Sequence, residues 1–317
     1  MGSTPIRPRG ADRLGGAVSA VADLRGAAMI LNPRARLALE WRDALRCGLR
    51  RLGLRRWWET EAPGHAAELA REAALDGASL LLVGGGDGTL HEVANGLLGP
   101  GRSPALPTLP PVLPLPLGTG NDFARSLGLP LAVERAARAL FAGHLRRVDA
   151  GLVNGTEVFL NVVGFGLDAE VVRVRWRRRT PRTYTPTVLR TLPTYAPLAL
   201  EVEGEAGWFR GRALAVSVLH GASIGGGYAL APGADPADGE FDVCVFEAMP
   251  PLVRLRALWQ VRGGRHERLR TFHRWRDRRL AVRGDVQIGH LDGELRTFEH
   301  GNTVHVTILP NAFPVLA

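Results

Sequence analysis

Two glycine-rich loops, each with an acidic residue, have the composition of a phosphate-binding site. Residues 84–89 read GGGDGT, and residues 116–122 read PLGTGND. Each loop follows a short apolar run and precedes a helical pattern. Glycines let the backbone turn so sharply that its N–H groups face one anion, and the start of the following helix adds a positive end. Two such loops together are typical of a site for a nucleoside triphosphate.

The acidic residue of the first loop, Asp87, indicates a metal. Its charge would repel a phosphate bound by the same loop unless a divalent cation, most simply Mg2+, lay between the two. Thr89 and Glu92 have the spacing of a capping box, which predicts that Thr89 caps a helix that ends near Gly99.

The chain has no lysine, so its 40 basic residues are all arginine, and its formal net charge is +9. A Schiff-base lysine is therefore excluded, as is a phosphate loop of the GxxxxGKS or GxxxxGKT kind. Phosphate contacts must come from backbone N–H groups, hydroxyls, arginine or a metal. Genomic base composition explains the arginine total, but residues 173–190 and 254–283 combine dense arginine with aromatic residues. Such segments suit an anionic lipid surface or nucleic acid, or they are simply solvated basic faces.

The first half of the chain alternates strand and helix patterns, which predicts a mostly parallel sheet covered by helices. The expected strands are residues 27–31, 56–59, 80–83 and 112–115, and the expected helices are residues 37–52, 64–75, 89–98, 122–127 and 133–142.

Strand patterns predominate from residue 147 onward and predict an antiparallel, sandwich-like second domain. The expected strands are residues 148–153, 157–163, 198–202, 207–218, 241–247, 279–283, 286–291 and 304–309. Residues 252–261 form an expected amphipathic helix with leucines and Trp259 on one side and arginines elsewhere. Residues 171–192 are too irregular to assign.

Size and cysteine content indicate a cytoplasmic protein. A chain of 317 residues favours two domains, and no apolar run approaches the roughly 20 residues that span a bilayer. Residues 1–25 lack the continuous apolar segment of a secretory signal and are interpreted as a disordered extension. Cys47 and Cys244 lack metal-ligand spacing and fit core thiols in a reducing compartment.

The ordered set of motifs resembles the diacylglycerol kinase catalytic-domain superfamily, in particular its bacterial soluble lipid kinases. The matching positions extend over most of the chain. They are Asn32-Pro33, Thr60, residues 85–89 with Glu92 and Asn95, residues 116–125, Asp149, Asn161, residues 164–166, residues 225–227, Asp238-Gly239 and residues 292–294.

The resemblance implies a two-domain lipid kinase fold with the active site in the cleft between the domains. Residues 26–146 would be an α/β ATP-binding domain, residues 147–309 a β-sandwich lipid-binding domain, and residues 310–317 would return to the first domain. ATP would be the co-substrate. Its binding residues would be Asn32, Thr60, Gly85, Gly86, Asp87, Gly88, Thr89, Leu90, His91, Glu92, Gly118, Thr119 and Asn121.

The resemblance also implies two magnesium sites and a base. Asp87, Asp122 and Asp149 would organise a catalytic Mg2+. Asp238, with main-chain oxygens of Asp235 and Glu240, would hold a structural one. The segment from Asp292 to Glu294 matches the part of the family that supplies the catalytic base. Phosphoryl transfer requires charge neutralisation and a base at the accepting hydroxyl, and we favour Glu294 over Asp292 for that role.

One position departs from the family pattern. Arg34-Ala35-Arg36 follows Pro33, where the family usually has a serine and a glycine. This replacement removes a hydroxyl and a glycine N–H from the nucleotide loop, and an arginine could take their place.

The leading hypothesis is an ATP-dependent kinase that phosphorylates a lipid hydroxyl, converting diacylglycerol to phosphatidic acid. It would act at the anionic inner surface of the membrane as a peripheral protein, bind no nucleic acid and require no other protein; a homodimer is left open. Two alternatives are a soluble kinase similar to NAD kinase and a non-catalytic nucleotide-binding or lipid-binding protein.

Overall fold

The computed structural model describes residues 23–100, 108–178, 184–299, 301 and 303–317. Most of the expected extension, residues 1–22, lies outside the described residues. The fold nevertheless begins before residue 26, the expected start of the first domain, because the Leu24 side chain is fully buried and its N–H donates to the Leu52 carbonyl.

The first domain is built on four parallel strands in the order β2-β1-β3-β4. These strands are β1 (Ala28–Leu31), β2 (Arg56–Glu59), β3 (Leu81–Gly85) and β4 (Val112–Pro116). Its helices are α1 (Ala38–Arg51), α2 (His65–Leu75), α3 (Asp87–Leu98), α4 (Asp122–Ser126), α5 (Val133–Ala137) and α6 (Ala139–Ala142). The predicted helix over residues 133–142 is therefore two short helices.

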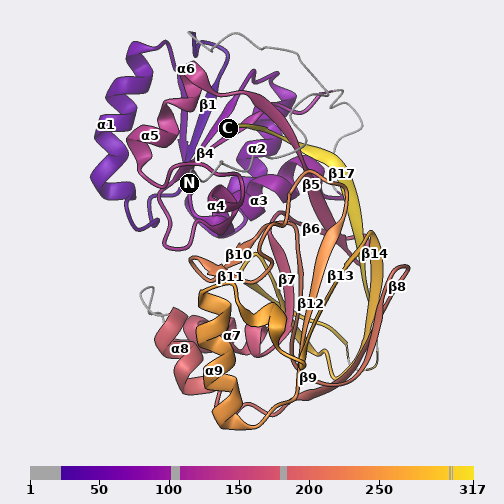
Figure 1. Ribbon diagram of the computed structural model, residues 1–317. Coiled ribbons are helices and arrows are strands. Elements are labelled where there is room, and N and C mark those ends of the chain that lie inside the picture. The colour runs from indigo at the N-terminus through magenta and orange to yellow at the C-terminus, as the bar shows by residue number, and fades with distance from the viewer. Residues whose placement is uncertain (1–22, 101–107, 179–183, 300, 302) are drawn as a thin grey trace, which may run out of the picture.

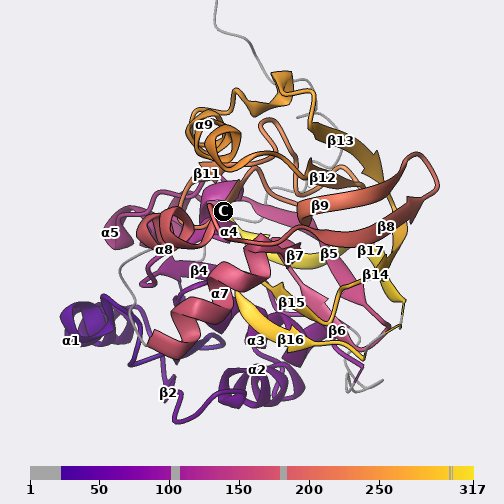
Figure 2. The same cartoon turned by 90° about the horizontal axis from the view of Figure 1, so that it is seen from below.

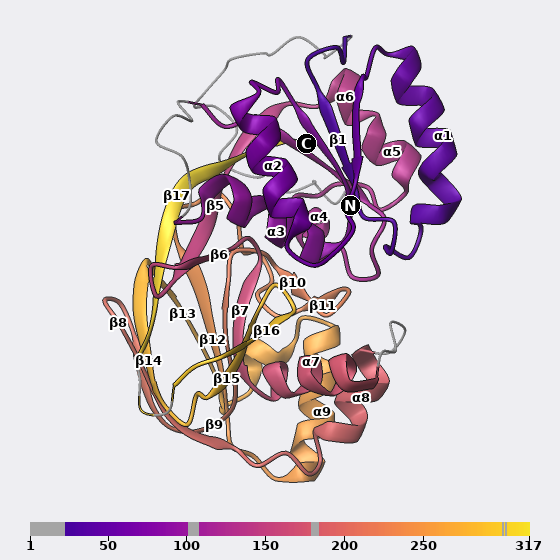
Figure 3. The ribbon, with the colours of Figure 1, turned by 180° about the vertical axis from the view of Figure 1, so that it is seen from behind.

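Both faces of this sheet are apolar because successive side chains of a strand point to opposite sides. Ala28 and Ile30 of β1 pack with α2 and α3, whereas Met29 and Leu31 pack with α1, α5 and α6. The helices thus cover the sheet on both sides, with α1 set apart from α2 and α3 (Figures 1 and 3).

The second domain is mostly antiparallel and encloses a core of its own. Its strands are β5 (Leu145–Val153), β6 (Glu157–Phe159), β7 (Val162–Gly166), β8 (Leu198–Gly204), β9 (Trp208–Leu219), β10 (Ser223–Ile224), β11 (Tyr228–Ala229), β12 (Phe241–Glu247), β13 (Phe272–Asp277), β14 (Arg279–Gly284), β15 (Ile288–Leu291), β16 (Glu294–Thr297) and β17 (Val304–Leu316). Its helices are α7 (Leu167–Arg178), α8 (Tyr184–Thr191), α9 (Pro251–Arg262) and the 3-10 turn His266–Arg268. Figure 2 shows α8 and α9 on one side of the domain and the β8–β9 hairpin on the other.

The last strand joins the two domains. β17 pairs with β14 and runs along β5 from Val306 to Leu316, and Val315 lies opposite Val112 of β4. One mixed sheet therefore continues from the second domain into the first.

The predicted strand over residues 157–163 is wrong in one respect, because it divides into β6 and β7. The N–H groups of Leu160, Asn161 and Val162 at the break donate to the Asp292 carboxylate instead of to a neighbouring strand. Residues 171–192, left unassigned above, include parts of α7 and α8, and β13 and β16 were not anticipated.

Helix α9 follows its amphipathic pattern only in part, because Leu255 and Leu258 pack inward while the other two apolar residues of the expected stripe face solvent. Arg254, Ala257 and Val261 are buried, whereas Leu252 is 83% exposed and Trp259 is 67% exposed. Cys244 is buried, as expected, but Cys47 is exposed on α1, which corrects the expectation of a core thiol there.

Candidate active site

The two glycine loops touch each other at the ends of β3 and β4. The N–H groups of Leu117 and Gly118 both donate to the Gly85 carbonyl. A Cβ atom at Gly118 would lie 2.4 Å from the Gly86 Cα, so only glycine permits this approach. Asn121 fixes the second loop with a left-handed backbone (φ 53°) and hydrogen bonds to both main-chain groups of Gly118.

The expected capping box does not form, because α3 begins two residues earlier, at Asp87. Thr89 Oγ1 instead accepts a hydrogen bond from Asn32 Nδ2 at 3.0 Å. Glu92 Oε2 accepts from the Ala66 N–H at 3.1 Å. The two side chains thereby tie α3 to the loop after β1 and to α2.

These contacts border a cavity of about 150 Å3 on one side of the start of α3. It is lined by Asn32, Arg34, Thr60, Glu61, Ala62, Pro63, Ala66, Thr89, Glu92 and Glu294. Four residues expected to bind ATP and the expected base therefore line one cavity, together with Arg34 of the loop that departs from the family pattern. We call this space the nucleotide-side cavity. The side chains of Leu90 and His91, expected at the same site, are buried in the interior, and a role of these two residues in ATP binding stays a prediction.

On the other side of the α3 start, Asp87 and Asp122 form a close acidic pair. A Cβ atom at Gly120 would lie 2.9 Å from Asp87 Oδ2 and 3.2 Å from Asp122 Oδ2. Burial, reinforced by the Asp122 charge, raises the pKa of Asp87 to about 7. Burial also raises the pKa of Asp122, although this carboxylate accepts hydrogen bonds from the Gly226 and Gly227 N–H groups and from the Ser223 hydroxyl.

The acidic pair lines a cavity of about 440 Å3, which we call the polar cavity. Gly88, Thr119 and Gly120 of the two loops contribute to its wall, as do Asp168, residues 224–226 and His290. Within the described part of the chain, no group of three or more His, Cys, Asp or Glu side chains is arranged to hold a metal ion.

Asp149, expected beside this pair, is placed elsewhere. Its two oxygens accept hydrogen bonds from the N–H groups of Gly239 and Asn311, at 2.7 Å each. It therefore connects the turn over residues 235–240 with β17 and is absent from the lining of the polar cavity. Asp238 in that turn lies 3.3 Å from an Arg276 nitrogen, and the structural Mg2+ at Asp238, Asp235 and Glu240 stays a prediction.

Asp292 is a buried structural centre. It is buried in a left-handed conformation (φ 50°) and accepts hydrogen bonds from the N–H groups at the β6–β7 break and from His91. Burial would raise its pKa, but the hydrogen bonds from His91 and the main chain lower it. These hydrogen bonds occupy both of its oxygens, but Asp292 also lines the polar cavity, so the choice between Asp292 and Glu294 as the base stays a prediction.

His91 belongs to a buried charge network that also contains Glu157 and Arg296. Burial alone would lower the pKa of His91, but its hydrogen bonds to Asp292 and Glu157 raise it to about 9. Hydrogen bonds from His91 and Arg296 lower the pKa of Glu157 to about 2 despite its burial. The network anchors α3 on the second domain, and motif reasoning missed both Glu157 and Arg296.

Glu294 differs from Asp292 in its surroundings. A Cβ atom at Gly88 would lie 2.7 Å from Glu294 Oε1, so this carboxylate lies against the first turn of α3. Burial raises its pKa, and the nearby negative charges of Glu92 and Asp292 contribute in the same direction. A carboxylate with a raised pKa beside a helix start is a suitable proton acceptor.

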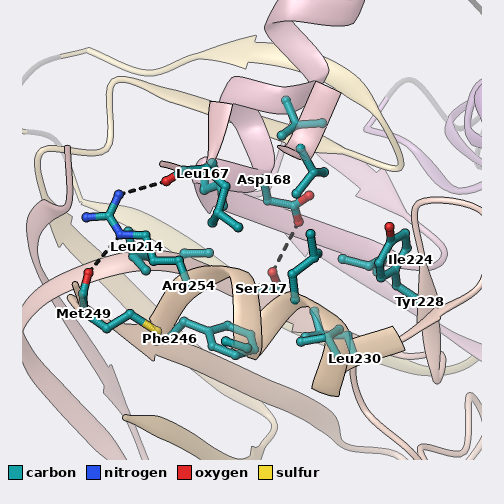
Figure 4. Close-up of a pocket in the computed structure, with 17 residues that line it drawn as sticks. Leu167, Asp168, Leu214, Ser217, Ile224, Tyr228, Leu230, Phe246, Met249 and Arg254 are labelled. Carbon is teal, nitrogen blue, oxygen red and sulfur yellow. Dashed lines mark hydrogen bonds between the residues drawn. The ribbon is translucent and has the colours of Figure 1, made fainter. Parts of the chain in front are cut away.

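A third cavity, apolar and about 100 Å3 in volume, lies between β9 and the three helices of the second domain (Figure 4). Its walls are mainly aliphatic and aromatic, and Asp168 and Ile224 line both this apolar cavity and the polar cavity. Asp168 Oδ2 accepts a hydrogen bond from the Ser217 hydroxyl and lies 3.0 Å from His290 Nε2. Motif reasoning missed Asp168 and Ser217 because neither belongs to a recognisable motif.

Known proteins resemble this chain in sequence and in fold. Residues 27–153 match the diacylglycerol kinase catalytic domain, and residues 161–317 match the YegS C-terminal NAD kinase beta sandwich-like domain. "Probable lipid kinase YegS" of Escherichia fergusonii is 32% identical over 74% of this chain and 79% of its own length. Diacylglycerol kinase of Bacillus subtilis is 34% identical over 59% of this chain and 61% of its own length.

A solved structure from Bacillus anthracis strain Sterne shares the fold, with a TM-score of 0.74 at 22% identity over 92% of this chain and 96% of that one. The matched catalytic domain and the relatives named above make this chain a kinase. The chain belongs to the lipid kinase family that joins a diacylglycerol kinase catalytic domain to a YegS-type C-terminal domain.

Proposed function

We propose that this kinase transfers the γ-phosphoryl group of ATP to the hydroxyl of a membrane lipid, with diacylglycerol as the acceptor and phosphatidic acid as the product. The observation that carries the proposal is the pair of adjoining cavities. An apolar cavity suited to an acyl chain borders, at Asp168 and Ile224, a polar cavity that reaches the glycine loops. A lipid whose chain occupies the first would present its head group to the second.

The nucleotide phosphates are held by backbone groups rather than by lysine. The start of α3 and the N–H groups of the two loops favour an anion there. Asp87 and Asp122 fit Mg2+, which is commonly bound by one or two carboxylates together with substrate phosphates. The bound ion would neutralise phosphate charge and relieve the repulsion by Asp122, which adds to burial in raising the pKa of Asp87.

Glu294 accepts the proton of the attacking hydroxyl in this proposal. Its raised pKa and its position against Gly88 support the role. Asp168, with both Ser217 and His290 beside it, holds the polar head of the lipid at the junction of the cavities.

The apolar cavity also separates the alternatives. A kinase for NAD has no use for an aliphatic cavity beside its phosphate loops, and a binding protein has no use for an acidic pair at the phosphates. Activity on NAD without lipid would support the first alternative, and tight ATP binding without transfer to any lipid would support the second.

The test is incubation with labelled ATP and Mg2+ and, in separate micelles, diacylglycerol, sphingosine, ceramide, phosphatidylglycerol or an isoprenoid alcohol, with NAD as a further acceptor. We expect label in phosphatidic acid. Asp87→Asn should reduce transfer about 100-fold or more, as loss of a charge-stabilising group does. Asp76→Asn, at an exposed acid beyond the end of α2, is the matched control and should leave transfer unchanged. Label in NAD alone, or equal transfer by Asp87→Asn, would contradict the proposal.

A membrane lipid as acceptor requires the kinase to work at a membrane surface. No helix in the described ranges has both the length and the apolarity needed to cross a bilayer. We therefore propose peripheral association with the inner membrane surface. A homodimer stays a prediction.

A further inference from the structure

Helix α9 presents large apolar side chains to solvent. Leu252 and Trp259 are 83% and 67% exposed, and Arg256 lies between them at spacings of four and three residues, so the three share one stripe of the helix. A surface helix normally turns such residues inward. The exposure of Leu252 and Trp259 must therefore have a structural cause.

The cause is the buried guanidinium of Arg254. Its Nε donates to the Met249 carbonyl at 2.8 Å, and its Nη1 donates to the Leu192 and Tyr195 carbonyls at 2.9 and 2.8 Å. Rotating α9 to bury Leu252 and Trp259 would break these bonds and leave the Arg254 charge unpaired in the interior. The outward orientation of the apolar stripe is therefore fixed by the fold.

Helix α8 extends the same kind of surface. Leu255 and Leu258 of α9 pack against Val188 and Leu192, so the two helices lie side by side, as Figures 1 and 2 show. Leu189 of α8 is 41% exposed and is followed by the exposed Arg190.

The charge of this surface has one sign. Neither α8 nor α9 contains an acidic residue. Some exposed arginines elsewhere in the second domain have acidic partners, for example Arg279 with Glu205 and Arg283 with Glu203. Within the part of the chain that the structure describes, no ion pair involves Arg190, Arg256 or Arg262.

We propose that this α8–α9 surface docks onto an anionic lipid bilayer, with Leu252 and Trp259 inserted among the lipids. The surface consists of Leu189, Arg190, Leu252, Val253, Arg256, Trp259 and Arg262. Tryptophan and leucine favour the region between head groups and acyl chains, and arginine keeps its charge at the phosphates while its stem stays in apolar surroundings.

Docking also defines a route for the substrate, a step that rests on the proposed function. Val188 of α8, Leu192 just after that helix, and Leu258 and Val261 of α9 line the apolar cavity. A lipid acyl chain can thus pass from the bilayer between the two helices into the cavity without crossing water.

A second copy of the chain fits the α8–α9 surface less well than an anionic bilayer does. A twofold contact places the same patch on both sides, so unpaired arginines would face one another without any acid to neutralise them. An anionic bilayer supplies the missing charge.

The test uses the whole chain and vesicles of phosphatidylcholine alone or mixed equally with phosphatidylglycerol, without ATP. We expect binding to the mixed vesicles only, weakened by salt. Leu252→Ala with Trp259→Ala should weaken binding about tenfold or more from lost apolar burial. Arg256→Gln should weaken it about fivefold, as expected for one surface charge. Trp208→Ala is the control, because Trp208 is 74% exposed on the β8–β9 hairpin, away from α9.

A second measurement follows quenching of tryptophan fluorescence by lipids brominated on the acyl chain. The wild type and Trp208→Phe should be quenched, whereas Trp259→Phe should lose most of the quenching. Circular dichroism and melting temperature confirm that each variant is folded. The double variant should also phosphorylate diacylglycerol in vesicles more slowly but in detergent micelles at the wild-type rate.

Wild-type vesicle binding by the α9 variants would overturn the proposal. So would a dimer that light scattering detects without lipid and that Trp259→Ala dissociates, because the surface would then join two copies. Failure of the kinase assay in micelles would contradict the proposed function alone, since vesicle binding is measured without ATP.

Discussion

Asp292 and Glu294 are two residues apart in the chain, but their carboxylates have different contacts and different roles. Asp292 holds the β6–β7 break through three main-chain N–H groups and His91, whereas Glu294 lies against the start of α3 with a raised pKa. Glu294→Gln should therefore lower kcat about 100-fold or more, as expected for loss of a general base. Its melting temperature should stay near that of the wild type.

Asp292→Asn is the matched comparison and should behave differently. Removing one partner of a buried charged group costs about 3 kcal/mol or more, so its free energy of unfolding should fall by that amount. Denaturant unfolding and initial rates on both variants separate the roles. A stable Asp292→Asn with full loss of kcat, beside an active Glu294→Gln, would reverse the assignment.

The His91 network makes stability depend on alkaline pH. Its hydrogen bonds to Asp292 and Glu157 raise the pKa of His91 from 6.5 to about 9. The folded state therefore holds this proton more tightly than the unfolded chain, and the stabilisation is complete below pH 6.5 and disappears as pH rises through about 9. The shift corresponds to about 3 kcal/mol.

We expect the free energy of unfolding, measured by urea titration from pH 6 to pH 10, to fall across this window. The difference between wild type and His91→Gln isolates the contribution of this imidazole. It should be largest at pH 6 and small at pH 10. A difference that is independent of pH would contradict the protonated state of His91.

The residue types in the two glycine loops correctly predicted most of the residues that line the candidate site. Asp87, Asp122 and Thr119 line one cavity, and Asn32, Thr60 and Thr89 line the other, on either side of the α3 start. The acids farther along the chain were harder to place, because their roles depend on contacts across the molecule. Asp292, for example, meets Val162 over a separation of 130 residues, and no local pattern contains that information.

At the scale of elements, contact between the two glycine loops should limit what either loop tolerates. A Cβ atom at Gly118 would lie 2.4 Å from the Gly86 Cα, and backbone cannot move aside as a flexible side chain can. We expect Gly118→Ala to destabilise the protein by about 1 to 3 kcal/mol and to weaken ATP binding about tenfold or more, since the loops must separate.

Gly48→Ala provides the control for that experiment. Gly48 lies within α1, and a Cβ atom there would meet nothing within 4 Å. The substitution should raise stability by about 1 kcal/mol, the helix-propensity difference between the two residues. Calorimetry for ATP and thermal melting of both variants provide the comparison, and equal behaviour would contradict the close loop contact.

A helix or strand could be predicted where burial of its own side chains determines its pattern of apolar residues. β1, β3 and β4 are apolar runs because both faces of the sheet are covered. The orientation of α9 was not predictable, because it depends on carbonyls of Leu192 and Tyr195 that accept from Arg254. The capping box at Thr89 failed for a similar reason, since Asn32 and Ala66 bind the two side chains that would have formed it.

At the scale of the whole molecule, the sequence changes near residue 147 from alternating strand and helix patterns to successive strand patterns. This change correctly indicated an α/β domain followed by a mostly antiparallel domain. It did not indicate that one sheet joins them. Strand β17 contributes to the core of both, with Val304 and Val306 in the second domain and Phe313 and Val315 in the first. The two cavities beside α3 are therefore framed by a single connected sheet, which suits a site that must hold two substrates in line.

The shared strand leads to a final prediction about the chain end. Phe313, Val315 and Leu316 are buried, and Phe313 meets Phe123 of α4 edge-on, with ring centroids 6.3 Å apart. Ending the chain after Pro310 would expose their partners and remove about 5 to 9 kcal/mol of apolar burial, comparable with the whole stability of a typical domain. We expect the shortened chain to lose its cooperative thermal transition and its ATP binding. Phe313→Leu, which keeps the strand, should cost only about 1 kcal/mol and retain both. A shortened chain that melts like the full one would show that the first domain is complete without β17.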